Sequence, residues 1–134
     1  MKPFVKWAGG KTQLLNEIEK MLPENINRYY EPFVGGGAVL LNFAFNNATI
    51  NDINQELIFT YECIKNQKDE LLKELDNLDK KKKKSPKEFY YHTRDLYNEM
   101  IMNQQKNISL AAMFIYLNKH CFNGLYRVNS KGLF

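Results

Sequence analysis

Two glycine-rich segments of the 134-residue chain contain residue types that bind phosphate groups in many proteins. The first, Gly10-Lys11-Thr12, ends like a P-loop, but that motif requires another glycine at position 5, where this chain has Val5. The second, Gly35-x-Gly37, opens like a dinucleotide-binding fingerprint, but Leu40 occupies the position of its third glycine. The spacing therefore favours neither a P-loop nucleotide triphosphatase nor a pyrophosphate-binding loop.

The wider setting of Gly35-Gly36-Gly37 still favours a ligand site. A glycine turn after a first strand lets the backbone approach a ligand closely. Asp52 ends the next predicted strand, where a carboxylate is placed to accept hydrogen bonds from ribose hydroxyls. The alternative is that Asp52 is a turn residue before Asn54, and the spacing alone does not separate the two interpretations.

Apolar periodicity and turn residues predict the elements that must position these residues. The first half reads as helix, strand, helix, strand and helix, over residues 12–22, 28–34, 38–45 and 48–52 and from a cap at Asn54. The glycine turn lies between the first strand and the helix that follows it. This order predicts a βαβ unit of a parallel sheet.

The second half is predicted to be mostly helical. One helix leads into Lys80 to Lys84, which we expect to be a solvated loop because five adjacent like charges repel; contact with nucleic acid is the alternative. Ser85-Pro86-Lys87-Glu88 has the capping-box pattern of a helix start, and Ser109 is placed to cap a last helix. Ser130-Lys131-Gly132 predicts a hairpin turn.

Composition excludes several classes of protein. With 44% apolar, 13% aromatic and 25% charged residues, the chain can bury a core, unlike a disordered or collagen-like chain or a disulfide miniprotein. Cys63 and Cys121 lack CxxC or histidine-partner spacing, which predicts reduced thiols in a cytoplasmic protein and no metal site. The longest apolar run, 110–117, is far shorter than the roughly 20 residues that cross a bilayer, so no membrane partner is expected.

The net charge of +4 is unevenly distributed. Residues 1–16 contain three lysines and no acid, residues 106–134 contain four basic residues and no acid, and all 15 acidic residues lie between them. If the fold brings the two ends together, they form one basic face toward a polyanion. The alternative is a chance distribution in a lysine-rich chain.

Four blocks of the sequence match a known family in the correct order. These blocks resemble successive motifs of the Dam-like, D12 class adenine-N6 DNA methyltransferases: Phe4-Val5-Lys6-Trp7-Ala8-Gly9-Gly10-Lys11, Tyr30-Glu31-Pro32-Phe33-Val34-Gly35-Gly36-Gly37-Ala38-Val39, Asn51-Asp52-Ile53-Asn54 and Tyr116-Leu117-Asn118-Lys119-His120-Cys121-Phe122-Asn123-Gly124-Leu125-Tyr126-Arg127. The agreement is weakest between residues 65 and 107.

The resemblance implies an α/β fold, namely a Rossmann-like S-adenosylmethionine-dependent methyltransferase with an incomplete parallel sheet and an inserted, mostly helical target-recognition region. It implies that residues 1–60 form the first part of the cofactor-binding domain. Residues 61–134 would then form the recognition region, which ends in a truncated DNA-reading hairpin.

The resemblance also implies S-adenosyl-L-methionine as cofactor, bound by Trp7, Lys11, Phe33, Gly35 and Asp52. Trp7 would supply an apolar wall, Lys11 a cation for the methionine carboxylate, and Asp52 an acceptor for the ribose. Without the family, Trp7 is also compatible with a core residue, and Lys11 with a surface lysine at a helix start.

The last block implies a segment that enters double-stranded DNA, with contacts from Lys119, Phe122, Asn123, Leu125 and Arg127. An aromatic ring such as Phe122 can wedge between base steps, and an arginine such as Arg127 can bind guanine O6 and N7, in agreement with a GATC-like site. The alternatives are a buried phenylalanine, a turn asparagine and a solvated arginine.

Methyl transfer to adenine N6 requires acceptors that hold the flipped amino group, and the family uses an Asp-Pro-Pro-Tyr motif for this. The four prolines of this chain include no adjacent pair, so no catalytic residue is predicted within it. We therefore expect the amino-terminal half of a methyltransferase, inactive alone, whose partner is a missing carboxy-terminal half. The other hypothesis is a non-catalytic DNA- or cofactor-binding module, and the resemblance leaves both restriction-modification and housekeeping roles open.

Overall fold

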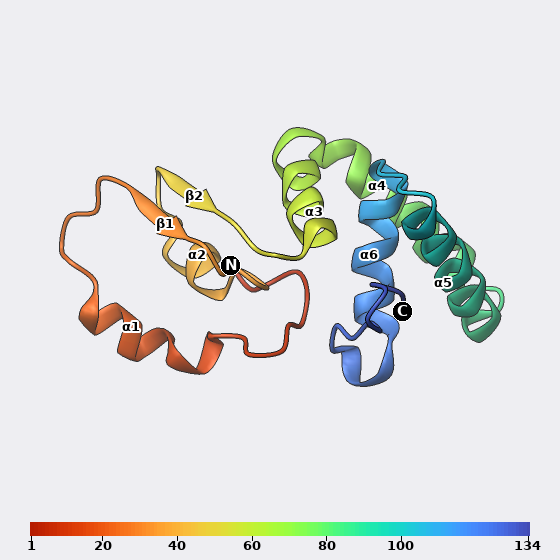
Figure 1. Cartoon of the computed structure of the whole chain (residues 1–134), viewed down its shortest axis with the longest axis horizontal. Helices are drawn as coiled ribbons and strands as arrows, with labels where there is room; N and C mark the ends of the chain where they lie inside the picture. The colour runs from red at the N-terminus through yellow and green to blue at the C-terminus, as the bar shows by residue number, and fades with distance from the viewer.

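The computed structural model describes all 134 residues of the chain. Two short strands and their helices lie on one side of the molecule and four longer helices on the other (Figure 1). In chain order the elements are η1 (Thr12–Leu14), α1 (Leu15–Met21), β1 (Tyr29–Glu31), α2 (Ala38–Phe43), β2 (Ala48–Ile50), α3 (Gln55–Asn66), α4 (Lys68–Lys82), α5 (Pro86–Met102), α6 (Ile108–His120) and η2 (Phe122–Gly124). The fold is therefore a mixed helix and strand architecture with a small parallel sheet.

The predicted βαβ unit is confirmed. Strand β1 pairs in parallel with β2, with Glu31 opposite Ile50, and α2 connects them. Both strands are shorter than predicted, since the regular pairing begins at Tyr29 and Ala48 and ends at Glu31 and Ile50. Two further backbone bonds, from Asn51 to Glu31 and from Val34 to Asn51, carry the pairing up to the glycine turn.

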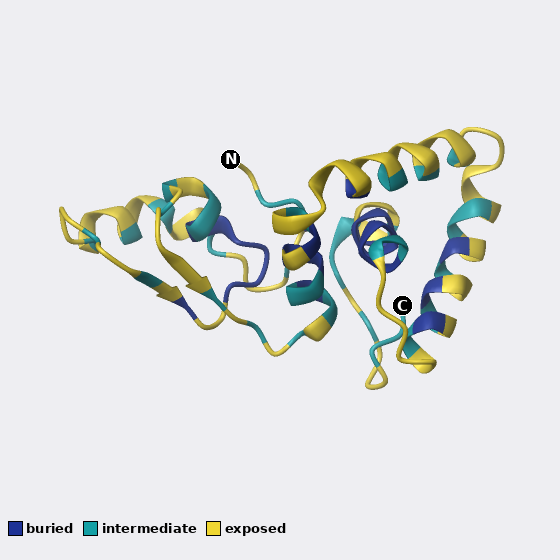
Figure 2. Ribbon diagram, turned by 90° about the horizontal axis from the view of Figure 1, so that it is seen from above, coloured by how far each residue is buried: buried dark blue, intermediate teal, exposed yellow.

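Helix α6 forms the centre of the hydrophobic core. Every residue from Leu110 to Asn118 is buried, and α6 packs against α3, α4 and α5. Seen end-on in Figure 2, α6 is surrounded by these three helices. The apolar periodicity had indicated one buried face, but a helix that is apolar on nearly all sides is stable only when it is enclosed.

Two predictions about helix ends are wrong. The cap of α6 is Asn107, whose Oδ1 accepts from the Leu110 N–H at 3.0 Å, whereas the Ser109 hydroxyl lies 3.3 Å from Glu74. The lysine run is not all loop, because α4 continues through Lys82. Ion pairs to acids one turn earlier, such as Lys80 with Asp76 at 2.8 Å, offset the repulsion between the lysines.

Other local predictions hold in part. Helix α5 begins at Pro86 as predicted, but the Ser85 side chain makes no capping bond. Helix α1 lies where its periodicity placed it, although none of its residues is buried and Met21 is 84% exposed. The predicted domain boundary after residue 60 falls inside α3. No helix combines the length and apolarity that a membrane span requires.

The assignment of Asn107 as the N-terminal cap of α6 can be tested by substitution. We expect Asn107→Ala to lower the free energy of unfolding by about 1 kcal/mol, because the Leu110 N–H loses its acceptor. The matched change Ser109→Ala should cost less than about 0.5 kcal/mol. Urea unfolding of the two variants measures both costs, and a larger cost for Ser109→Ala would contradict the assignment of Asn107 as the cap.

Candidate functional site

A cavity of about 760 Å³ lies where the amino-terminal segment, the glycine turn and the end of α6 meet. Four lysines line it, Lys2, Lys6, Lys11 and Lys119, and Asp52 is the only acidic residue in its wall. The first three belong to one acid-free end of the sequence and Lys119 to the other. The fold therefore brings the two acid-free ends together around one cavity. This is the condition under which the charge distribution predicted a basic face.

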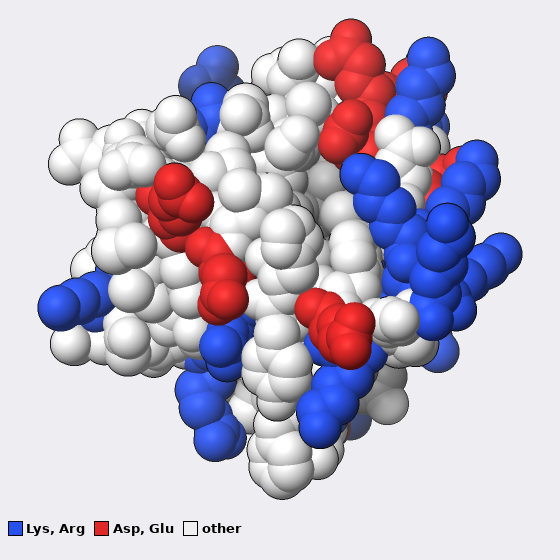
Figure 3. All heavy atoms as spheres, turned by 90° about the vertical axis from the view of Figure 1, so that its right-hand side faces the viewer, with Lys and Arg blue, Asp and Glu red and all other residues white.

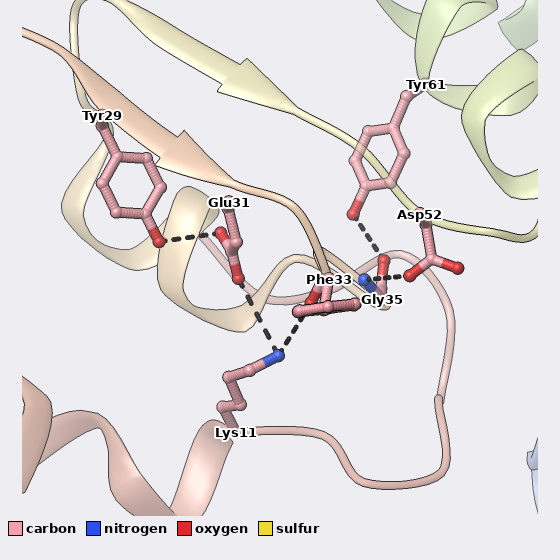
Figure 4. Close-up of polar contacts among 7 residues, drawn as sticks. All are labelled: Lys11, Tyr29, Glu31, Phe33, Gly35, Asp52 and Tyr61. Atoms are coloured by element: carbon pink, nitrogen blue, oxygen red, sulfur yellow. Dashed lines mark hydrogen bonds and ion pairs between the residues drawn. The ribbon is translucent and has the colours of Figure 1, made fainter.

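Asp52 holds the glycine turn against the end of β2. Its Oδ2 accepts from the Gly35 N–H at 3.0 Å (Figure 4). Its Oδ1 accepts from the Asn54 N–H at 3.0 Å. The second bond is the turn role considered for Asp52, and the first ties it to the cavity. A carboxylate has about four acceptor positions, so roughly two remain for a ligand.

The glycine turn needs glycine at two of its positions. Gly35 has φ +51°, and a Cβ added there would lie 2.9 Å from Cδ1 of Trp7. Gly37 has φ +79°, and a Cβ there would collide with the Tyr61 hydroxyl. Side chains with a Cβ rarely adopt these backbone conformations, so both the angles and the close neighbours select glycine.

Tyr61 is a site residue that sequence reasoning missed. Its hydroxyl donates to the Gly35 carbonyl oxygen at 2.9 Å. Burial, with smaller contributions from the carboxylates of Glu31 and Asp52, raises the pKa of Tyr61 above its ordinary value, which keeps the donating proton in place. The sequence showed Tyr61 only as part of an apolar helix face.

Glu31 lies in the second motif block but is not among the predicted cofactor-binding residues. It is 7% exposed, and its Oε2 accepts from the Tyr29 hydroxyl at 2.9 Å, while Oε1 lies 3.9 Å from the Lys11 Nζ (Figure 4). Burial and then this hydrogen bond to Glu31 raise the pKa of Tyr29. Lys11 also donates to the Phe33 carbonyl oxygen at 3.0 Å. A carboxylate at the end of an otherwise apolar strand was the available signal.

Trp7 packs against core aromatic rings and also lines the cavity. Its ring stacks on Tyr126 with centroids 4.3 Å apart and lies 6.4 Å from the ring of Phe114 in the core. It also lines the cavity, together with Phe33, which is 76% exposed. The cavity wall therefore includes one aromatic ring held by the core and one that projects from the surface.

The residues implied for DNA contact lie at the end of α6 and beyond it. Lys119 lines the cavity, Phe122 is 79% exposed, and Arg127 is exposed. Asn123 has φ +57° and its carbonyl oxygen accepts from the Lys6 Nζ at 3.2 Å. Leu125 is half-buried and pairs in parallel with Lys6. Phe122 is thus not the buried residue of the alternative interpretation.

The predicted turn near the last residues is present. The Gly132 N–H donates to the Asn129 carbonyl oxygen at 3.0 Å, and the Asn129 N–H donates to the Leu133 carbonyl oxygen at 2.9 Å.

No cluster of three or more His, Cys, Asp or Glu side chains has the arrangement of a metal site.

Residues 7–134 match the family model described as D12 class N6 adenine-specific DNA methyltransferase. The chain belongs to this family. It is 47% identical to the type II methyltransferase M.MjaIII of Methanocaldococcus jannaschii, 40% to the type II methyltransferase M1.LlaDCHI of Lactococcus lactis subsp. cremoris, and 38% to the DNA adenine methylase of Escherichia coli K12. These matches cover 100%, 100% and 99% of this chain.

The same matches cover 50%, 46% and 46% of the three relatives. The D12 class chain therefore spans about half the length of the curated relatives that it matches. The four motif blocks on which the resemblance was stated all fall within the shared region, since the aligned part is nearly the whole chain.

The contact between Gly37 and Tyr61 can be tested by a double-mutant cycle. Gly37→Ala should destabilise the protein by more than about 2 kcal/mol, because a left-handed φ costs an alanine about 1–2 kcal/mol and its Cβ meets the Tyr61 hydroxyl. In the Tyr61→Phe background the cost should fall by at least about 0.5 kcal/mol. Additive costs in urea unfolding would show that the two groups do not touch.

Proposed function

We propose that this chain is the cofactor-binding and DNA-contacting part of an enzyme that transfers a methyl group from S-adenosylmethionine to adenine N6 in DNA. The observation that supports this best is the cavity in which the glycine turn, Asp52 and the two acid-free ends of the sequence come together. We also propose that the βαβ unit is the first part of a Rossmann-like sheet, and that residues 61–134 form the target-recognition region.

The residues around the cavity fit S-adenosylmethionine in chemistry and in size. A volume of about 760 Å³ lies within the usual range of small-molecule sites. Trp7 and Phe33 offer apolar surface for the adenine, Asp52 has free acceptor positions for the ribose, and Lys11 has a cation for the methionine carboxylate. The Asn118 Nδ2 is buried without a partner in the same wall and is a further donor for the ligand. When bound, this cofactor supplies an electrophilic methyl group on a sulfonium sulfur.

The residues beyond α6 support a DNA substrate. Phe122 is exposed at the end of α6, where its ring can wedge between base steps and unstack the target adenine. Arg127 is exposed and suited to a bidentate contact with guanine, which fits a GATC-like site. Lys119 and Lys131 add positive charges that can contact phosphates. Such contacts strengthen DNA binding but do not distinguish one base sequence from another.

The second candidate function is binding of DNA or cofactor without catalysis. It is supported by the absence of any Pro-Pro pair, and hence of an Asp-Pro-Pro-Tyr motif, from the 134 residues. Without acceptors for the flipped amino group, this chain alone would bind cofactor or DNA and transfer nothing. We propose that activity requires a carboxy-terminal half that carries this motif, either in the same chain or in a second polypeptide.

Cofactor binding can be measured by calorimetry with S-adenosylmethionine. We expect Phe33→Ala and Asp52→Ala each to weaken binding roughly tenfold, or about 1.4 kcal/mol, because each removes a contact from the cavity wall. Tyr30→Ala is the control, since Tyr30 is exposed on β1 and outside the cavity. Unchanged affinity in the Phe33→Ala variant, which alters an exposed side chain, would remove this site from the proposal.

Methyl transfer separates the two functions. The 134 residues alone should incorporate no labelled methyl group into duplex DNA, whereas a chain extended by an Asp-Pro-Pro-Tyr half should do so. Replacing the aspartate of that motif by alanine is the control and should abolish incorporation. Transfer by the 134 residues alone would show that the acceptor groups lie within this chain. If the extended chain also transfers no methyl group, the proposed methyltransferase activity is wrong and the binding function is retained.

A further inference from the structure

A second cavity, of about 440 Å³, lies at the end of α6 and is lined by residues from α4, α5, α6 and η2. Its size is within the range of small-ligand sites. Its wall is formed by two lysines, several aromatic rings and no acidic residue: Lys82, Pro86, Lys87, Tyr90, Tyr91, Tyr116, His120, Cys121 and Phe122. The combination of cations and flat rings is that of a site for an aromatic anion.

The two lysines of this cavity differ in how far they are already engaged. His120 Nδ1 lies 2.8 Å from the Tyr116 carbonyl oxygen, which can only accept, so Nδ1 carries a proton. In the neutral ring Nε2 then accepts, and Lys82 Nζ is 3.3 Å away. Lys82 also lies 3.5 Å from Asp79 Oδ1, whereas Lys87 is exposed with no ion pair. Lys87 is therefore the freer of the two cations.

The aromatic rings offer surfaces on which a base can stack. The Tyr116 and His120 rings are stacked with centroids 4.2 Å apart, and Tyr91, which is 45% exposed, lies edge-on to Tyr90 at 5.5 Å. The Tyr116 hydroxyl is buried and has no hydrogen-bond partner. An unpaired buried hydroxyl is costly, and a ligand that enters this cavity would satisfy it.

The position of the cavity relates it to the DNA-contacting segment. Asn118, Lys119 and Gly124 line the first cavity, whereas His120, Cys121 and Phe122 line the second, so one short segment contributes to both. On the face drawn in Figure 3, one group of lysine and arginine side chains lies at the right margin, and other basic side chains lie singly around the face. Because Phe122 lines the second cavity, a duplex that meets its ring would lie next to that cavity.

We propose that this second cavity binds a nucleotide unstacked from the duplex beside Phe122, with its base against the tyrosine rings and its phosphate on Lys87 and Lys82. Base stacking on aromatic side chains and phosphate contacts from lysines are the two terms that hold unpaired nucleotides on proteins. The proposal rests on the proposed DNA substrate for its biological meaning. Its chemistry can be tested separately from methylation.

The first measurement uses thymidine 5′-monophosphate, which contains a base and a phosphate but no adenine for the first cavity. Titrated into the chain, it should shift the NMR signals of the His120 and Tyr91 rings. Tyr91→Leu should weaken this binding about tenfold by removing a stacking surface, and Tyr91→Phe should retain it. Absence of any shift at these two rings would overturn the proposal.

The second measurement compares a fully paired duplex with a duplex that carries one unpaired thymidine. The chain should bind the second more tightly, and Tyr91→Leu should abolish this preference. Lys87→Gln should lower the slope of log affinity against log salt by about 0.7–0.9, the value for one lost phosphate contact. Lys73→Gln, which removes an exposed charge of α4 outside the cavity, should leave the preference unchanged.

Failure of this proposal and failure of the proposed function give different results. Arg127→Gln should weaken binding of both duplexes equally and leave the mononucleotide titration unchanged. If S-adenosylmethionine and paired duplex bind but neither the mononucleotide nor the unpaired thymidine has an effect, the second cavity is not a nucleotide site. If the mononucleotide binds at His120 while neither duplex binds, the cavity is a nucleotide site, but DNA is not the substrate and the duplex is not the source of the bound nucleotide.

Discussion

The backbone of Lys6 is the point on which both walls of the main cavity depend. Its N–H donates to the Asn118 Oδ1 at 3.0 Å, and its carbonyl oxygen accepts from the Tyr126 N–H at 3.0 Å. Asn118 is fully buried, so its Oδ1 would be left without a partner if the contact were lost. Because Trp7 stacks on Tyr126 next to this junction, the amino-terminal segment is fixed to α6 by hydrogen bonds and by an aromatic contact.

A second junction, at Asp52, holds the other side of the cavity. The carboxylate accepts one N–H from the glycine turn and one from the start of α3, so a single side chain sets the distance between them. Asn54 then caps α3 through Leu57 and donates to the Tyr126 hydroxyl at 2.9 Å, which links this junction to the first. The site is built from short loops, and each is positioned by hydrogen bonds to a helix end.

The electrostatic arrangement follows from the same contacts. Lysines from two acid-free ends of the sequence surround one cavity, and the residues that follow α6 carry further basic side chains toward solvent. Such a concentration of positive charge attracts a polyanion to the region around the cavity. The electrostatic field of the lysines is stronger inside a cleft with low-dielectric walls than on an open surface. In this D12 class chain, Lys119 belongs both to the cavity wall and to the residues proposed to contact DNA.

The sequence by itself determined the order of the elements, the parallel pairing of β1 with β2 and the identity of the family. Apolar periodicity, the glycine turn and the motif blocks are local patterns, and residues close in sequence carry them. It could not show that Tyr61 holds Gly35, that Glu31 lies beneath Lys11, or that Asn107 rather than Ser109 caps α6. Those features, with the enclosure of α6 and the bond between Lys6 and Asn118, 112 positions apart, were decided by the tertiary structure, because packing selects among partners that the sequence leaves equally available.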